Sequence, residues 1–154
     1  MVLWRISNYT DFSGLGGEKS DGRWHSARRG KRIVYLAEHP AVSILEIIAN
    51  LEGNPALFPD TCQLMKAVAD ETVSVEAVEP AGLSPTWETN FLETRKVGDL
   101  WLAEGRSALL AVPSVTSPES TNYLFNPLHR DAAGLKIEWT KKVSYDKRIF
   151  KLTA

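Results

Sequence analysis

The chain has 154 residues, of which 44% are hydrophobic and 24% are charged, and its formal net charge is −1. This length and balance are typical of one globular domain spanning 1–154, with no direct nucleic-acid contact expected. No apolar run approaches the roughly 20 residues of a membrane span, and we expect no secretory signal and no membrane contact. A single cysteine, Cys62, excludes an internal disulfide, which favours a cytoplasmic protein.

The charge is unevenly distributed along the chain. From 19 to 32 there are six basic residues and one acid, whereas from 70 to 104 there are eight acids and two bases. The basic segment could meet a phosphate-bearing ligand or an acidic partner, and its last four basic residues are also typical of a solvated loop. These four are Arg28, Arg29, Lys31 and Arg32.

In chain order, the first predicted elements are two strands and a helix. Residues 2–6 and 33–37 are short runs of bulky and β-branched residues, which favour strands. The glycine-rich segment 13–17 indicates a loop, and it lacks the lysine of a phosphate-binding loop. A helix begins at Pro40, carries an apolar stripe at helical spacing, and ends at Gly-Asn-Pro, residues 53–55.

The second half of the chain is predicted to be richer in strands. Pro80 and Pro85 mark a turn region, 94–103 is a short helix that ends at Gly105, and the apolar run 108–112 is typical of an interior strand. Further strands are expected at 72–78, 135–139, 143–145 and 149–152. Because strands outnumber helices and do not alternate regularly with them, we predict an α+β fold.

Glu46 is a lone carboxylate inside the apolar stretch of the first predicted helix. Helical spacing places it beside Ser43 and Asn50, on a polar stripe. It could therefore be a solvent-facing residue. It could also face a cleft, where a carboxylate would stabilise a developing positive charge or orient a water molecule.

Two arginines and a tyrosine could form the rest of a binding site. The guanidinium of Arg23, between Gly22 and Trp24, suits phosphate oxygens, but it could instead stack on the tryptophan. Arg5, inside the first strand, could point to solvent or hold a phosphate in a cleft. Tyr35 could pack in the core or stack on a flat heterocycle.

Small polar residues follow the apolar run 108–112. Ser114 comes after a proline, where it could place a hydroxyl at a sheet edge or simply cap a turn. Asn122 belongs to a compact polar and aromatic segment that we expect to be a loop. The three histidines have no metal-ligand spacing with each other or with Cys62, so no metal site is predicted.

Together these segments resemble the RES domain family, the toxin half of bacterial Xre–RES type II toxin–antitoxin systems. The similar segments are 4–6 (WRI), 21–26 (DGRWHS), 34–40 (VYLAEHP), 45–46 (LE), 98–102 (GDLWL), 112–114 (VPS) and 122–129 (NYLFNPLH). The resemblance covers nearly the whole chain, from Trp4 to about Arg148. His25 stands where the family usually has asparagine, and the loop 27–32 is slightly long and more basic than usual.

The resemblance implies an ADP-ribosyltransferase-like fold, a split mixed β-sheet with flanking helices and a central NAD cleft. It also implies a toxin that degrades cellular NAD by cleaving the nicotinamide–ribose bond, through hydrolysis or phosphorolysis. NAD would be a substrate rather than a prosthetic group. The expected partner is an Xre-type helix-turn-helix antitoxin, and the chain could also form an oligomer.

Carried onto this sequence, the resemblance gives each candidate residue a role. Glu46 would be the catalytic carboxylate, Arg23 would bind the pyrophosphate, and Tyr35 would stack near the nicotinamide. Ser114 and Asn122 are further expected NAD-binding residues, and so is Arg5. Two other functions stay open: a mono-ADP-ribosyltransferase that modifies a cellular protein, and a catalytically silent domain that binds a partner.

Overall fold

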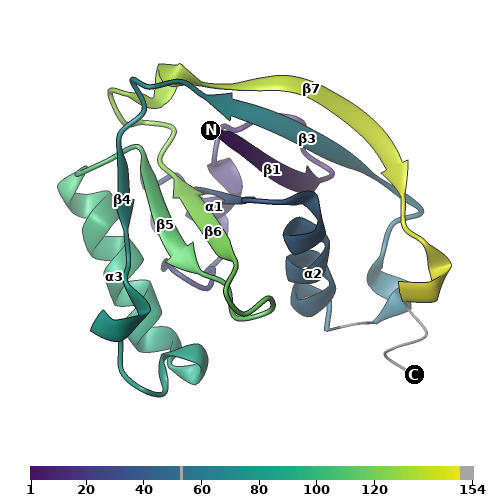
Figure 1. Cartoon of the computed structure of the whole chain (residues 1–154), viewed down its shortest axis with the longest axis horizontal. Helices are drawn as coiled ribbons and strands as arrows, with labels where there is room; N and C mark the ends of the chain where they lie inside the picture. Colours follow the sequence, from purple (N-terminus) through teal and green to yellow (C-terminus); the bar gives the residue numbers. More distant parts are fainter. Residues whose placement is uncertain (53, 150–154) are drawn as a thin grey trace.

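A computed structural model describes residues 1–52 and 54–149 of the chain (Figure 1). In this part of the chain the strands form one seven-stranded sheet, in the order β4-β5-β6-β2-β1-β3-β7. The strands are β1 (Val2–Ser7), β2 (Val34–Ala37), β3 (Thr61–Ala69), β4 (Val75–Ala77), β5 (Leu109–Pro113), β6 (Thr121–Phe125) and β7 (Leu135–Ser144). The α-helices are α1 (Leu15–Lys19), α2 (Pro40–Asn50) and α3 (Phe91–Glu104). Strands β4 and β5 are parallel and the other pairs are antiparallel, so the predicted α+β class with a mixed sheet is confirmed.

The sheet is divided into two halves at the contact between β1 and β2. These two strands pair at one position, Trp4 with Ala37, whereas β1 pairs with β3 along its whole length. One half contains β4, β5, β6 and β2, and the other contains β1, β3 and β7. Figure 1 shows β1, β3 and β7 running across the top of the molecule, above β4, β5 and β6. The split mixed sheet that the family resemblance implies is therefore present.

Helix α2 lies beside the junction of the two halves, where it packs against both β1 and β2 (Figure 1). Pro40 occupies its first turn, and the ring Nδ1 of His39 accepts the N–H of Ala41 at 3.1 Å. Ser43 Oγ donates a hydrogen bond to Trp4 O at 3.2 Å, which ties the helix to β1. The predicted start of this helix is confirmed.

Helix α3 covers one face of the half that contains β5 and β6. Trp101 of α3 is fully buried against this face, together with Leu110, Val112 and Leu124. Asn90 caps the start of the helix by accepting the N–H of Glu93, and Gly105 ends it in a left-handed conformation with φ of 57°. A second buried cluster, on residues of both sheet halves, includes Leu3, Val34, Leu36, Ala67 and Phe125.

Several predicted elements differ from the structure. Strands β3 and β6 were not expected, α1 begins within the predicted glycine-rich loop and extends beyond it to Lys19, and the strands predicted at 135–139 and 143–145 are one strand, β7. The strand predicted at 149–152 lies outside the described residues except for Ile149, whose N–H donates to Asp146 O in a turn. No helix in the described part of the chain has the length and apolar character needed to span a bilayer.

Candidate functional site

Glu46, in the middle of α2, is half-buried, and its carboxylate is held by polar groups from β6 and the turn after β5. Its Oε1 atom accepts hydrogen bonds from Ser114 Oγ at 2.9 Å, Thr116 Oγ1 at 2.8 Å and Asn122 Nδ2 at 2.7 Å. Glu46 is therefore not a simple solvent-facing helix residue. The structure brings three predicted residues together, and it adds Thr116, which sequence reasoning missed.

All three donors converge on a single carboxylate oxygen. Within residues 1–52 and 54–149, Oε2 of Glu46 has no hydrogen-bond or ion-pair partner. Hydrogen bonds to an ionised group are the strong ones, so they fix the orientation of the carboxylate. One oxygen is thus anchored, and the other can interact with a positive centre in a ligand.

The three donors come from β6 and from the turn between β5 and β6. Val112 of β5 pairs with Asn122 of β6, and Ser114 follows directly after β5. The N–H of Ser114 donates to Ser120 O at 3.0 Å, and its Oγ accepts the N–H of Ser117 at 3.1 Å. These bonds close the turn and hold the Ser114 hydroxyl beside the Asn122 amide.

The guanidinium of Arg23 lies against the N-terminal end of α3. Its Nη2 donates to the backbone oxygens of Trp87, at 3.1 Å, and Glu88, and its Cζ lies 4.6 Å from the centroid of the Phe91 ring. Burial lowers the pKa of Arg23, and the charge of Glu46 is the main effect that opposes this. Among the described residues, the buried Nε of Arg23 has no hydrogen-bond partner.

Helix α3 also fixes the loop that carries Arg23. Thr94, which is fully buried, donates its hydroxyl to Arg23 O at 2.7 Å. At Gly98 the helix approaches the loop so closely that an added Cβ would lie 1.7 Å from Trp24 O. The position of Arg23 thus depends on a helix that comes much later in the chain. Thr94, for example, is 71 residues away from Arg23 in the sequence.

The hydroxyl of Tyr35 belongs to a partly buried chain of hydrogen bonds. It accepts the N–H of Trp24 at 3.0 Å and lies 2.7 Å from His25 Nδ1, while His25 Nε2 lies 3.0 Å from Gly17 O. Because a carbonyl only accepts, Nε2 donates the hydrogen of the contact with Gly17 O, and Nδ1 is the ring atom that faces the tyrosine hydroxyl. Burial raises the pKa of Tyr35 well above its ordinary value. The hydroxyl is used within the protein, which leaves the ring as the part that can contact a ligand.

Arg5 lies on β1, in the other half of the sheet. Burial lowers its pKa, and the charge of Asp11 opposes that effect. Its Nε atom is buried and has no hydrogen-bond partner in the part of the chain that the structure describes. No hydrogen bond or ion pair between described residues joins Arg5 to Glu46, so the structure does not include Arg5 in the hydrogen-bonded cluster.

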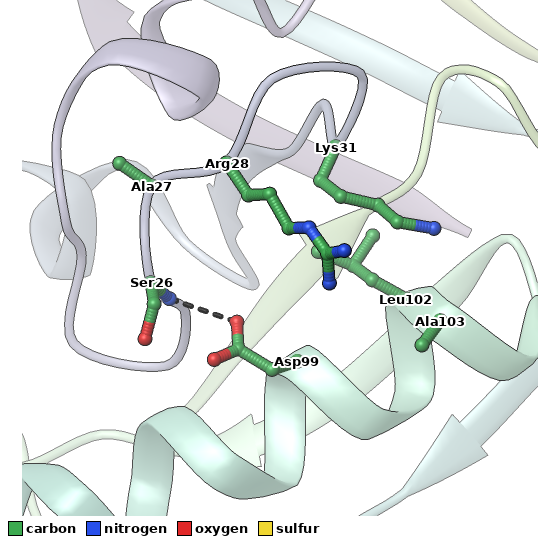
Figure 2. Close-up of a pocket in the computed structure, with 7 residues that line it drawn as sticks. All are labelled: Ser26, Ala27, Arg28, Lys31, Asp99, Leu102 and Ala103. Atoms are coloured by element: carbon green, nitrogen blue, oxygen red, sulfur yellow. Dashed lines mark hydrogen bonds between the residues drawn. The ribbon is translucent and has the colours of Figure 1, made fainter.

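Two surface hollows lie on the outer side of α3, away from this cluster. The smaller, of about 270 Å³, lies between loop residues 26–31 and α3 residues 99–103 (Figure 2). The larger, of about 630 Å³, continues along α3 to Leu92. Glu46 lines neither hollow, so the candidate site is defined by its side-chain network.

A half-buried carboxylate is thus held beside the junction of a split mixed sheet, in a domain of the predicted α+β class. A family model described as the RES domain matches residues 2–148. The chain therefore belongs to the RES domain family, which confirms the resemblance found in the sequence.

Relatives and a solved structure agree with this placement. Toxin Res of Pseudomonas putida is 43% identical over 150 residues, covering 97% of this chain and 100% of that protein. The Prs ADP-ribosylating toxin of Sphingobium sp. is 35% identical over 159 residues, covering 97% and 96%. The predicted class is confirmed: the chain is a RES toxin. A chain in the crystal structure of the M. tuberculosis MbcT–MbcA toxin–antitoxin complex superposes with a TM-score of 0.74 at 12% identity, covering 99% of this chain and 87% of that one, which shows the shared fold.

Proposed function

We propose that this toxin consumes cytoplasmic NAD by cleaving the bond between nicotinamide and ribose, with Glu46 as the catalytic carboxylate. The observation that carries the proposal is the asymmetry of that carboxylate: three donors hold Oε1, and Oε2 has no partner among the described residues. A carboxylate with one anchored and one available oxygen suits the stabilisation of a cation.

The chemistry of NAD cleavage needs little more than such a carboxylate. When the C1′–N bond breaks, its electron pair leaves with nicotinamide, whose ring loses its positive charge, and the ribose becomes oxocarbenium-like. The leaving group departs neutral and requires no general acid. Oε2 of Glu46 would stabilise the ribose cation or orient the attacking nucleophile. An attacking water would pass its proton through Oε2 to solvent as its oxygen bonds to C1′, whereas phosphate would attack through an oxygen that is already ionised.

The two predicted arginines support a phosphate-bearing substrate. Arg23 and Arg5 are the two side chains in the described residues with a buried nitrogen that has no hydrogen-bond partner, in each case Nε. A buried donor left unpaired costs about 1–3 kcal/mol, so such groups call for an acceptor. The pyrophosphate of NAD would supply oxygens to Arg23, and Arg5 would hold a further part of the anion.

The remaining predicted residues have supporting roles in this proposal. Ser114 and Asn122 would act chiefly by holding Glu46, since both donate to its Oε1. Tyr35 would offer its ring for stacking near the nicotinamide, because its hydroxyl is already bonded to Trp24 and His25.

The central test is the replacement Glu46→Gln, assayed by loss of NAD and release of nicotinamide. Glutamine keeps the shape of the side chain but removes the negative charge, so we expect turnover to fall about 10²–10³-fold, the usual effect of losing a main electrostatic group. Glu71→Gln, at an exposed position in the turn between β3 and β4, is the matched control and keeps full activity. Full NAD turnover by a folded Glu46→Gln variant would remove Glu46 from the mechanism.

A second candidate function is the transfer of ADP-ribose to a cellular protein. It is favoured by one comparison, because a relative 35% identical to this chain is called the Prs ADP-ribosylating toxin. The first bond cleavage is the same, and the two functions differ in the acceptor. Incubation with labelled NAD, with and without phosphate and lysate, separates them: free nucleotide products support hydrolysis or phosphorolysis, and labelled protein supports transfer. No consumption of NAD at all would favour a silent partner-binding domain.

We also propose an antitoxin as the partner of this chain, of the Xre helix-turn-helix type. The structural similarity to a chain of the MbcT–MbcA complex supports a toxin–antitoxin pair, since that structure contains both components.

A further inference from the structure

We propose that a groove along the outer side of α3 binds an acidic amphipathic helix of a protein partner. The groove, which we call the α3 groove, runs between loop residues 26–31 and α3 residues 92–103. It is continuous because the two hollows described above share Ser26, Arg28, Asp99 and Ala103. Figure 2 shows the side chains of Arg28 and Lys31 extending from the loop across to Leu102 and Ala103 of α3.

The α3 groove carries positive charge that the protein does not neutralise. Its lining includes Arg28, Lys31 and Lys96, and none of these side chains has a hydrogen bond or ion pair with any residue in 1–52 or 54–149. The acids in the lining, Asp21 and Asp99, each accept a backbone N–H of the loop, at 2.7 and 2.8 Å, and Asp21 also lies 3.8 Å from Arg95, so that four lining cations face two carboxylates. The unpaired cations therefore select an occupant that carries negative charge.

The same groove exposes apolar side chains that a small anion would not use. Leu92 is 84% exposed and Leu100 is 50% exposed. They lie eight residues apart with Lys96 midway between them, and Ala103 follows, so that these residues share one helical face. Large apolar side chains exposed together on one face are typical of an interaction surface. The occupant must therefore be apolar as well as acidic.

The length and shape of the groove favour a helix. From Leu92 to Ala103 the helix rises about 16 Å, three turns, which matches the contact length of a second amphipathic helix. Leucine-like side chains of that helix would pack beside Leu92 and Leu100, and its carboxylates would pair with Arg28 and Lys96. Because this apolar face borders a hollow and is interrupted by Lys96, the surface suits a helix in a groove better than a bilayer.

This inference is independent of the NAD chemistry, because Glu46 does not line the groove. It can be tested with a labelled 15-residue helical peptide that carries leucines on one face and glutamates on both flanks. We expect fluorescence anisotropy at physiological salt to show binding to the full chain. Peptides with every glutamate changed to glutamine, or every leucine changed to serine, should bind at least ten-fold more weakly, since each loses one half of the predicted contact.

Variants of the protein locate the binding surface. Arg28→Glu, Lys96→Glu and Leu100→Ser should each raise the peptide Kd at least ten-fold while NAD turnover stays at the wild-type value. Lys142→Glu, an equal charge reversal at an exposed position on β7, is the matched control and should change the Kd less than two-fold. Circular dichroism confirms that the variants are folded, which is expected because the replaced residues are exposed or line a surface hollow.

Several outcomes would overturn the proposal. They are no binding of the acidic peptide, equal weakening by Lys142→Glu and Lys96→Glu, and tighter binding to phosphatidylserine vesicles or to a single-stranded oligonucleotide than to the peptide. A wild-type chain that binds the peptide at the groove but does not consume NAD would contradict only the proposed enzymatic function.

Discussion

At the scale of single residues, Thr116 has the same contact with Glu46 as the predicted residues Ser114 and Asn122. Its hydroxyl lies 2.8 Å from the same carboxylate oxygen. The letters that surround it, Val115 and then Ser117-Pro118-Glu119-Ser120, are typical of an ordinary turn, so nothing local distinguishes Thr116. The family resemblance predicted the other two, whereas the role of Thr116 depends on the fold of the turn and could not be read from the sequence.

We expect Thr116→Val to lower kcat for NAD cleavage about ten-fold, because one of three charge-assisted hydrogen bonds on Glu46 is lost at nearly constant shape. KM should change little, since Thr116 has no predicted contact with NAD. Thr116→Ser keeps the hydroxyl and should restore most of kcat. Steady-state kinetics check this, and equal rates for the valine variant and the wild type, or equally slow valine and serine variants, would contradict the positioning role.

At the scale of secondary structure, the elements with a regular apolar pattern were predicted, and the strands without one were not. The apolar stripe of α2 and the apolar run of β5 were found because their patterns are regular. Strand β3 was missed because its buried side chains do not alternate between Cys62 and Met65, and its leucine, methionine, lysine and alanine residues do not favour strands. Strand β6 was taken for a loop because its first residues, Thr121 and Asn122, are polar.

The packing of α3 on the loop that carries Arg23 predicts a strong effect of Gly98→Ala. An added Cβ would lie 1.7 Å from Trp24 O, so either the loop or the helix must shift. We expect the free energy of unfolding to fall by about 1–3 kcal/mol, as in other overpacked interiors, and NAD turnover to fall with it. Gly16→Ala, in α1, is the control, because nothing lies within 4 Å of its added Cβ. Urea denaturation measures the difference, and equal stabilities of the two variants would contradict this packing.

At the scale of the whole molecule, Tyr35 makes the free energy of unfolding depend on pH in the alkaline range. Burial raises the pKa of Tyr35, so the folded protein keeps the phenol neutral after the unfolded chain, with an ordinary value of about 10, has begun to ionise. The unfolded state then binds fewer protons than the folded state. The free energy of unfolding is therefore unaffected by Tyr35 ionisation below about pH 10, and it decreases as the pH rises above that value.

We expect Tyr35→Phe to reduce this alkaline decrease, measured by urea denaturation between about pH 9 and 11. The decrease should not vanish, because burial also raises the pKa values of Tyr123 and Tyr145. Tyr9→Phe, at a position that is 72% exposed, should leave the slope unchanged. A Tyr35→Phe variant with the wild-type slope would show that this phenol does not govern the alkaline behaviour.

The overall arrangement of the chain was predicted in class but not in detail. The α+β class followed from the ratio and order of elements, and the split of the sheet followed from the family resemblance. The position of the split could not be predicted, because the sequences of β1 and β2 contain no pattern that shows they pair only at Trp4 and Ala37. The same limit applied to Arg5 and Arg23, because the placement of Arg5 on β1 relative to Arg23 in the loop before β2 is a property of the whole fold.

That lone pairing makes the boundary between β1 and β2 the natural axis of bending. Rotation about this boundary would break very few backbone hydrogen bonds, and it would be opposed by the packing of α2 on both strands and by the buried cluster that Leu3, Val34 and Ala67 share. A molecule held at once by Arg5 and Arg23 would span this axis and restrict the rotation. Occupancy of the site would then be visible far from it, as slower amide hydrogen exchange along β1 and β2.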